Sequence, residues 1–306
     1  MPCLAMLALA SMMPAMTDPA LDAAARNAVG TAIIKFKDKN LKGDEIAVSV
    51  ARLDRAHGSW AVGSCRGEVA MYPASVVKLF YLVYLANRLE DGSLKLTPEL
   101  ERAAKDMIVE SINDATSLVV DTLTDTTSGP ELRPAELKKW AEKRNLVNRW
   151  YRANGFQGLN ICQKPWNEGP YGRERQFVGE RYDNRNMLTA DACVRLMAEI
   201  ALDKTAPYGA PATPSGLKRG AWMKGFLSRK PVADGGEGDE QSKGFSGEVL
   251  PKGFKLWSKA GWTSTVYHDV AWIQAPDGRE FVWAIFTKGH SDDKIVPFVA
   301  GELLKL

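Results

Sequence analysis

The sequence predicts an α+β fold: an antiparallel sheet built from both chain ends, covered by the terminal helices, with an inserted all-helical lobe. Strand patterns occur only near the two ends, over residues 46–62 and 254–287. The long stretch between them has mainly helical periodicity. We therefore expect one domain over residues 17–306. Its sheet lobe would comprise residues 17–70 and 251–306, and its helical lobe residues 71–250.

The first elements alternate between helical and strand patterns. Apolar residues at helical spacing predict a helix over residues 17–41, and residues 46–53 have the pattern of a strand with a hairpin partner at 59–62. A strongly apolar helix is expected from Ser75 to about Leu89.

The rest of the chain follows the same two periodicities. Residues 145–185 are irregular and rich in aromatic residues, and the polar, glycine-rich residues 234–244 are expected to form a loop. Further helices are expected from Thr97, over 107–123 with a break at 110–114, and over 134–143, 188–200, 220–229 and 292–306. Strands are expected over 254–257, 267–274 and 280–287.

The composition excludes some classes of function. Hydrophobic residues make up 45% of the chain and charged residues 25%, and the net charge is only +3. These values are ordinary for a globular protein and provide no basic face for a nucleic acid. We expect a small-molecule partner and a monomeric chain.

The histidines and cysteines give no sign of a metal site. The three histidines are far apart in the sequence, and none of the four cysteines forms a Cys-x-x-Cys pair. We expect no metal and no other cofactor. A disulfide between two of Cys65, Cys162 and Cys193 remains open.

Residues 1–16 form a separate N-terminal segment that is apolar and rich in small residues. Ala8-Leu9-Ala10 fits a signal cleavage site, although no positively charged leader precedes it. The segment is either signal-like or the product of a wrongly placed start, and we expect export to the periplasm or beyond. No later stretch is long and apolar enough to span a membrane.

A Ser-x-x-Lys pair, Ser75 and Lys78, is the main chemical signal. Residues three apart share a helix face, so the pair predicts an amine beside a hydroxyl in apolar surroundings. A desolvated lysine can activate a serine as a nucleophile. Two other such pairs lie in polar stretches. Any one pair taken alone is more often a helix-start serine with an unrelated lysine.

Two more motifs follow in the chain. Ser111-Ile112-Asn113 is the only Ser-x-Asn, and by itself it could be a polar break between helices. Lys259-Ala260-Gly261 follows an expected strand, and by itself Lys259 could be an edge-strand lysine. The three motifs together, in this order, are a stronger signal than any one of them.

Together they resemble the Ser-x-x-Lys, Ser-Asp-Asn, Lys-Thr-Gly signature of the serine β-lactamase and penicillin-binding protein superfamily. The resemblance is closest to class A β-lactamase-like serine hydrolases. It covers about residues 20–306 and is loosest over 128–187 and 203–250. It implies the β-lactamase/transpeptidase-like fold and a serine acyl-hydrolase that acts on a β-lactam, a peptide or an ester through an acyl-enzyme.

The resemblance also implies roles for individual residues. Ser75 would be the nucleophile, Lys78 would help to remove its proton, and Ser111 would pass a proton to the leaving nitrogen. These three form the predicted catalytic set.

Four further residues would bind the substrate. Asn113 would bond the substrate's amide, and Lys259 would attract an anionic substrate and lower the pKa of the neighbouring lysine. Gly261 and Trp262 lie at the expected oxyanion hole, which the backbone N–H groups of Ser75 and Trp262 would form.

The chain departs from the family pattern in three places. Ile112 replaces an aspartate that is mainly structural in the family. Ala260 stands where the family usually has a hydroxyl for the substrate carboxylate, so that contact would need a substitute from Thr263, Ser264 or His268.

The family's Glu-x-x-Leu-Asn run, whose glutamate activates the deacylating water, is also absent. Glu168, Glu174 and Glu180 lie in the corresponding region, but none is in the motif, and each is more simply a solvated surface residue. Acylation is therefore better supported than fast deacylation.

Three functions remain open at this stage. β-Lactam hydrolysis is the most specific one. A cell-wall D-Ala peptidase or a small-ester esterase is the second. A non-catalytic binding protein on the same scaffold is the third.

Overall fold

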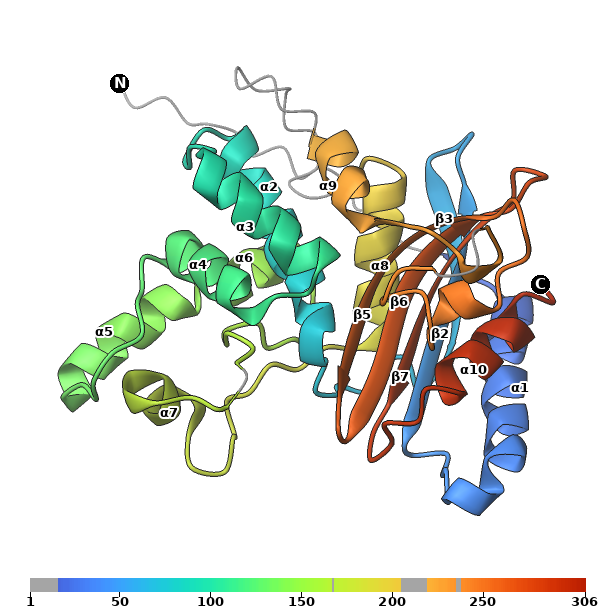
Figure 1. The fold of residues 1–306 in the computed structure, drawn as a ribbon, viewed down its shortest axis with the longest axis horizontal. Helices are drawn as coiled ribbons and strands as arrows, with labels where there is room; N and C mark the ends of the chain where they lie inside the picture. The colour runs from blue at the N-terminus through green and yellow to red at the C-terminus, as the bar shows by residue number, and fades with distance from the viewer. Residues whose placement is uncertain (1–15, 167, 205–218, 235–237) are drawn as a thin grey trace.

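The computed structural model describes residues 16–166, 168–204, 219–234 and 238–306. In this part of the chain a seven-stranded sheet lies beside a lobe of helices (Figure 1). The predicted α+β fold is thereby confirmed. Residues 1–15 of the predicted signal-like segment lie outside the described residues.

The sheet joins the two ends of the chain, because β2 pairs with β7 in antiparallel register, with Ser49 opposite Ala284. The strand order is β1-β3-β2-β7-β6-β5-β4, and only the β1–β3 pair is parallel. β4 is a short strand from within the predicted helical lobe. The strands are β1 (Met16–Thr17), β2 (Ile46–Asp54), β3 (Ser59–Cys65), β4 (Ser228–Arg229), β5 (Lys255–Thr263), β6 (Val266–Gln274) and β7 (Glu280–Thr287).

Helices cover both faces of the sheet. α1 (Pro19–Lys35) and α10 (Ile295–Leu303) pack on one face, as predicted for the terminal helices. α8 (Ala190–Ala201), whose N-terminus is capped by the Thr189 side chain, packs on the other face against β2 and β7. An internal helix thus completes the sheet lobe, which the prediction from the chain ends alone did not include.

The helical lobe contains two helices that the sequence did not predict. α6 and α7 fall inside residues 145–185, where no regular element was expected. Aromatic packing onto α2 holds α6, because Tyr151 lies against Phe80 at 5.1 Å between ring centres. The helices of this lobe are α2 (Val77–Glu90), α3 (Pro98–Val109), α4 (Asn113–Thr124), α5 (Pro134–Arg144), α6 (Leu146–Ala153), α7 (Gly172–Val178) and α9 (Arg219–Leu227).

α2 forms the centre of the larger core. Every residue from Val77 to Asn87 is buried. A helix buried on all sides must be apolar nearly all round, so the ammonium-bearing Lys78 in its first turn is an exception that needs a local explanation.

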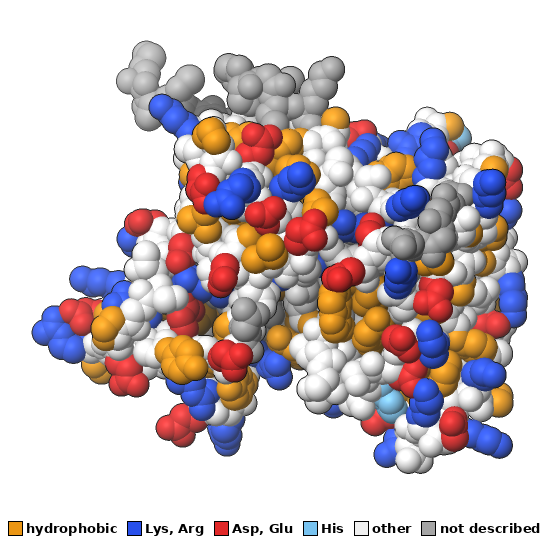
Figure 2. Space-filling view, viewed as in Figure 1, with side chains coloured by type: hydrophobic (Ala, Val, Ile, Leu, Met, Phe, Trp, Pro, Cys, Tyr) orange, Lys and Arg blue, Asp and Glu red, His pale blue; other side chains and the backbone are white. Residues whose placement is uncertain are grey.

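The surface carries charges of both signs, and Figure 2 shows Lys and Arg side chains interspersed with Asp and Glu over one face. Cys65, Cys162 and Cys193 are all free thiols, so the disulfide that the sequence left open is not formed. Among the described helices, none combines the length and apolarity that a bilayer crossing requires.

Candidate active site

Ser75 lies in a strained turn directly before α2. The turn is the 3₁₀ segment η2 (Ala74–Val76), rather than the first turn of an α-helix as expected. Ala74 has φ of 46°, a left-handed conformation that costs a non-glycine residue roughly 1–2 kcal/mol. Such strain is often concentrated at functional sites. The turn leaves the Ser75 side chain half-buried at the junction of the two lobes.

Gly261 lets strand β5 approach this turn backbone to backbone. A Cβ atom at Gly261 would lie 2.7 Å from the Pro73 carbonyl oxygen, 2.7 Å from the Val76 nitrogen and 2.8 Å from the Ser75 nitrogen. Any side chain would therefore push the strand away. The close approach brings the β5 backbone at Gly261, the residue before Trp262, next to the N–H group of Ser75.

Lys78 is fully buried and points at the segment between α3 and α4. Its Nζ donates to the Ser111 carbonyl at 2.5 Å and to Asn113 Oδ1 at 2.8 Å, and lies 3.3 Å from Ser111 Oγ. Burial lowers the pKa of Lys78 from 10.5 to about 7. Among the described residues, no hydrogen bond joins Lys78 Nζ to Ser75 Oγ, so the direct contact expected from their spacing is not formed.

Ser111 connects the two lysines of the site. Its backbone is left-handed, with φ of 58°, where the chain turns from α3 into α4. Its Oγ lies 3.3 Å from Lys78 Nζ and 3.1 Å from Lys259 Nζ. A hydroxyl can accept two hydrogen bonds and donate one, so this oxygen can accept from both amines and still present a proton.

Lys259 is fully buried on β5. Its Nζ also donates to Gln241 Oε1 at 2.5 Å and to the Ala260 carbonyl at 2.7 Å. Burial lowers its pKa well below the usual value, and the nearby Lys78 and Arg229 cations lower it further. We expected Lys259 to lower the pKa of Lys78, but burial is the cause there.

Gln241 is a site residue that the sequence did not reveal. Its Oε1 accepts from Lys259 and from the Ala260 N–H at 3.2 Å. Its Nε2 donates to the carbonyls of Ile108 and Val109, at 2.9 and 2.7 Å. The buried amide therefore ties β5 to the last turn of α3. No motif marks it, because it lies in the glycine-rich stretch predicted to be a loop.

His268 does not supply the substrate contact that Ala260 lacks. Its Nδ1 accepts from the Thr287 N–H at 3.1 Å, and its Nε2 donates to the Tyr72 carbonyl at 2.9 Å. Burial lowers the pKa of His268 to about 4, so the ring is neutral with both nitrogens engaged. Thr263, at the half-buried end of β5, remains a candidate for that contact.

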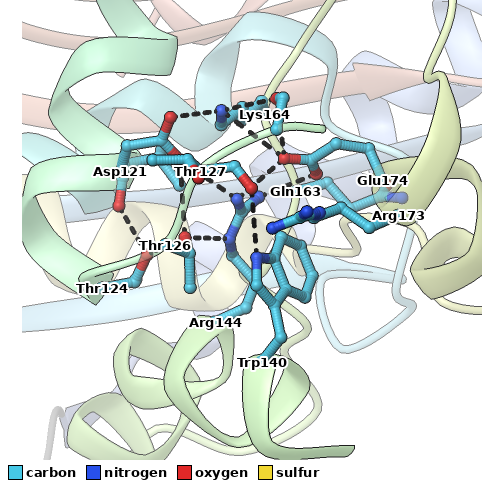
Figure 3. A network of polar contacts seen from close by, with 12 residues as sticks. Asp121, Thr124, Thr126, Thr127, Trp140, Arg144, Gln163, Lys164, Arg173 and Glu174 are labelled. Atoms are coloured by element: carbon cyan, nitrogen blue, oxygen red, sulfur yellow. Dashed lines mark hydrogen bonds and ion pairs between the residues drawn. The ribbon is translucent and has the colours of Figure 1, made fainter. Parts of the chain in front are cut away.

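Glu174 is not the solvated surface residue that was expected, because it is buried in an ion-pair network. Arg144 Nη1 and Nη2 donate to its two carboxylate oxygens at 2.9 and 2.8 Å, and Lys164 Nζ lies 3.5 Å from Oε1. Asp121 also contacts both cations, at 3.1 and 2.6 Å (Figure 3). A carboxylate held by a bidentate guanidinium is a poor general base.

The other two glutamates in this region do not fill that role either. Glu168 and Glu180 are both exposed, which agrees with a solvated-surface interpretation of each. None of the three glutamates therefore has the setting expected of a general base that activates a water molecule.

Comparisons with known proteins point to one family. The model of the beta-lactamase enzyme family matches residues 31–301. No curated protein sequence matches the chain.

Solved structures with the same fold share little sequence with this chain. A variant of the TLA-1 extended-spectrum β-lactamase has a TM-score of 0.63 at 12% identity, covering 92% of this chain and 98% of that one. PBP-A, as a variant in acyl-enzyme complex with penicillin G, has a TM-score of 0.61 at 16% identity, covering 92% and 96%. A β-lactamase from Sphaerobacter thermophilus has a TM-score of 0.61 at 17% identity, covering 91% and 96%.

Proposed function

Since the chain belongs to the beta-lactamase enzyme family and is a β-lactamase-like serine hydrolase, we propose that it acylates Ser75 with β-lactams and hydrolyses the adduct slowly. One observation carries the proposal. Ser111 Oγ lies between Lys78 Nζ and Lys259 Nζ, at 3.3 and 3.1 Å, beside the strained turn that bears Ser75. This arrangement provides a base, a proton relay and a positive charge around one nucleophile.

The acylation step uses these groups in sequence. Neutral Lys78 takes the proton of Ser75 Oγ as the oxygen attacks the lactam carbonyl carbon. The new C–O bond forms, and the negative charge on the carbonyl oxygen is held by the N–H groups of Ser75 and Trp262. When the ring C–N bond breaks, Ser111 donates its proton to the ring nitrogen. Lys78, which took the proton of Ser75, then reprotonates Ser111.

Recognition of the substrate rests on charge and one amide. Lys259 and Arg229 bring two basic side chains to the region beside the neutral Lys78, which favours an anionic substrate. Asn113 Oδ1 accepts from Lys78 Nζ, which places this residue beside the base, where the family pattern has the residue that bonds the substrate's amide.

Slow deacylation is expected because none of the three glutamates in the region is set up to activate water. Glu174 is neutralised by Arg144, and Glu168 and Glu180 are exposed. The same feature supports a second candidate function, a cell-wall D-Ala peptidase or small-ester esterase in which a nucleophile other than a glutamate-activated water resolves the acyl-enzyme.

On the composition of residues 1–16 we also propose that the protein is exported. We further propose that it acts as a monomer.

Intact-mass measurement after incubation with penicillin G tests the proposal. We expect the protein to gain the mass of one penicillin, and the Ser75→Ala variant to gain nothing. Nitrocefin turnover then separates the functions, since steady hydrolysis indicates a β-lactamase and a persistent adduct indicates a penicillin-binding enzyme. An adduct that still forms on Ser75→Ala, or no adduct on the wild type, would overturn the assignment of the nucleophile.

A further inference from the structure

A pocket lies beside the turn that carries Ser75. Its volume is about 560 Å³, and Tyr72, three residues before the serine, forms part of its wall. Three residues of chain span at most about 11 Å, so the pocket lies within reach of one elongated ligand whose other end is at the serine. Thr265, in the turn between β5 and β6, and Val266, the first residue of β6, also line the pocket.

The polar groups of this pocket are mainly cationic. Arg66, Arg185 and Lys288 line it, against one carboxylate, Asp44. The Nε atoms of Arg66 and of Arg185 are both buried and have no hydrogen-bond partner among the described residues. Three cationic side chains against one carboxylate give the pocket an excess of positive charge, which favours an anionic ligand.

The two arginines are held in place by local structure. Arg66 has φ of 58°, a left-handed backbone that favours glycine, in the turn after β3. Its Nη2 donates to the Asp44 carbonyl at 3.2 Å. The Arg185 guanidinium stacks 3.5 Å above the Tyr72 ring. Strain at a non-glycine residue that carries a pocket-lining cation is typical of a binding site.

The remaining wall is apolar. Val69, Met71, Met187 and Val266 supply aliphatic surface to the pocket. A ligand that complements both the cationic side chains and the aliphatic wall has an apolar stem and an anionic end. Planar carboxylates match guanidinium groups, which favours a carboxylate over a more strongly hydrated small anion.

We propose that this pocket binds the terminal carboxylate of an elongated, apolar acyl chain whose carbonyl carbon is attacked by Ser75. The inference rests on the proposed acyl-enzyme function and adds the class of acyl group that the site selects. Arg66 and Arg185 bind the carboxylate, Lys288 adds charge at the rim, and the aliphatic wall packs along the stem.

Kinetics with matched esters test this selectivity. The p-nitrophenyl monoesters of adipic and suberic acid carry the free carboxylate, and their methyl-capped counterparts do not. We expect the wild type to prefer the anionic ester in kcat/KM, and the ratio to fall about tenfold in Arg185→Met, the loss of roughly one charge-assisted hydrogen bond. Lys288→Met, at an exposed position, lowers the ratio without a risk to folding. Arg181→Met is the control, because that side chain is exposed in the same loop and lies outside the pocket.

A binding measurement separates this proposal from the proposed function. Calorimetry with monomethyl suberate on Ser75→Ala protein needs no acylation, and its dissociation constant should rise about tenfold when Arg185→Met is added. If no ester acylates the wild type but this difference persists, the pocket stands and the catalytic proposal fails. Equal dissociation constants with and without Arg185→Met, or an ester ratio that neither Arg185→Met nor Lys288→Met changes, would overturn the pocket.

Discussion

Burial of the Lys78 amine at the start of an apolar helix sets the protonation state on which acylation depends. Its pKa is lowered to about 7, and a general base must be unprotonated. We therefore expect kcat/KM for penicillin acylation to rise with pH and to reach half its maximum near pH 7. Stopped-flow measurements between pH 5.5 and 9 would show the curve.

Lys78→Arg is the matched control for this pH dependence. An arginine stays charged at all these pH values, so we expect acylation to fall by about 10²–10⁴-fold and to lose the rising limb. A wild-type profile that is flat from pH 6 to 8 contradicts the assignment of Lys78 as the base.

Gly261 offers a steric test of the contact between β5 and the Ser75 turn. In Gly261→Ala the new methyl group lies within 2.8 Å of three backbone atoms that cannot rotate away. We expect a loss of about 1–3 kcal/mol in the free energy of unfolding and a larger relative loss in acylation rate. Gly301→Ala in α10, where an added Cβ has open space, is the control and should not lower either quantity.

Gln241 offers a test by charge. Gln241→Glu puts a carboxylate against Lys259 Nζ, now 2.5 Å from the amide oxygen, and should raise the pKa of both coupled lysines. The midpoint of the acylation profile should move to higher pH. Gln241→Leu removes the contact without adding charge, so it should lower kcat/KM and leave the midpoint in place. A purely structural role predicts the same midpoint in both variants.

At the scale of elements, the network around Arg144 fixes α4, α5 and the segment that carries Lys164 to one another. Arg144 is fully buried and contacts Glu174, Asp121 and Thr126 (Figure 3). Because α4 begins at Asn113, the same network supports one wall of the active site.

Removing this guanidinium leaves Glu174 without its main partner and Asp121 with Lys164 alone. We expect Arg144→Met to lower the free energy of unfolding by about 3–5 kcal/mol, measured by urea denaturation. Arg102→Met breaks an exposed i,i+3 pair with Glu99 and should change it by less than about 1 kcal/mol. Comparable effects in the two variants would mean that the buried network contributes little.

Elements with a long, regular pattern were predictable, and those that depend on contacts were not. β2 and β7 follow from nearly continuous apolar runs, and α8 follows from apolar residues at helical spacing after the Thr189 cap. The short helix α6 has apolar residues at helical spacing, at Leu146, Val147, Trp150 and Tyr151, and this signal was missed among the many aromatic residues around it. The short helix α7 has no such signal and depends on packing by its neighbours. The 3₁₀ turn at Ser75 depends on the left-handed Ala74, which no residue pattern indicates.

At the scale of the whole molecule, the site is assembled from segments far apart in the chain. The order of three motifs grouped Lys78, Ser111, Asn113 and Lys259, and hydrogen bonds join these side chains in the structure. Three of them lie near helix ends, whereas Lys259 lies in the middle of β5. The buried amide of Gln241 was missed, since a glutamine in a glycine-rich stretch acquires its role only when the fold brings β5 against α3.

Burying two lysines in one site also makes the stability of the whole fold depend on pH. The pKa of Lys78 is about 7 in the folded protein against 10.5 as its ordinary value. Between these values the unfolded chain binds more protons, so the free energy of unfolding should rise with pH, by on the order of 1 kcal/mol per pH unit from this residue. Urea denaturation at pH 7, 8 and 9 should give a shallower rise in Lys78→Met than in the wild type. All titrating groups except Lys259, whose pKa depends on the neighbouring Lys78, cancel in the difference, so equal slopes would show that the folded Lys78 keeps an ordinary pKa.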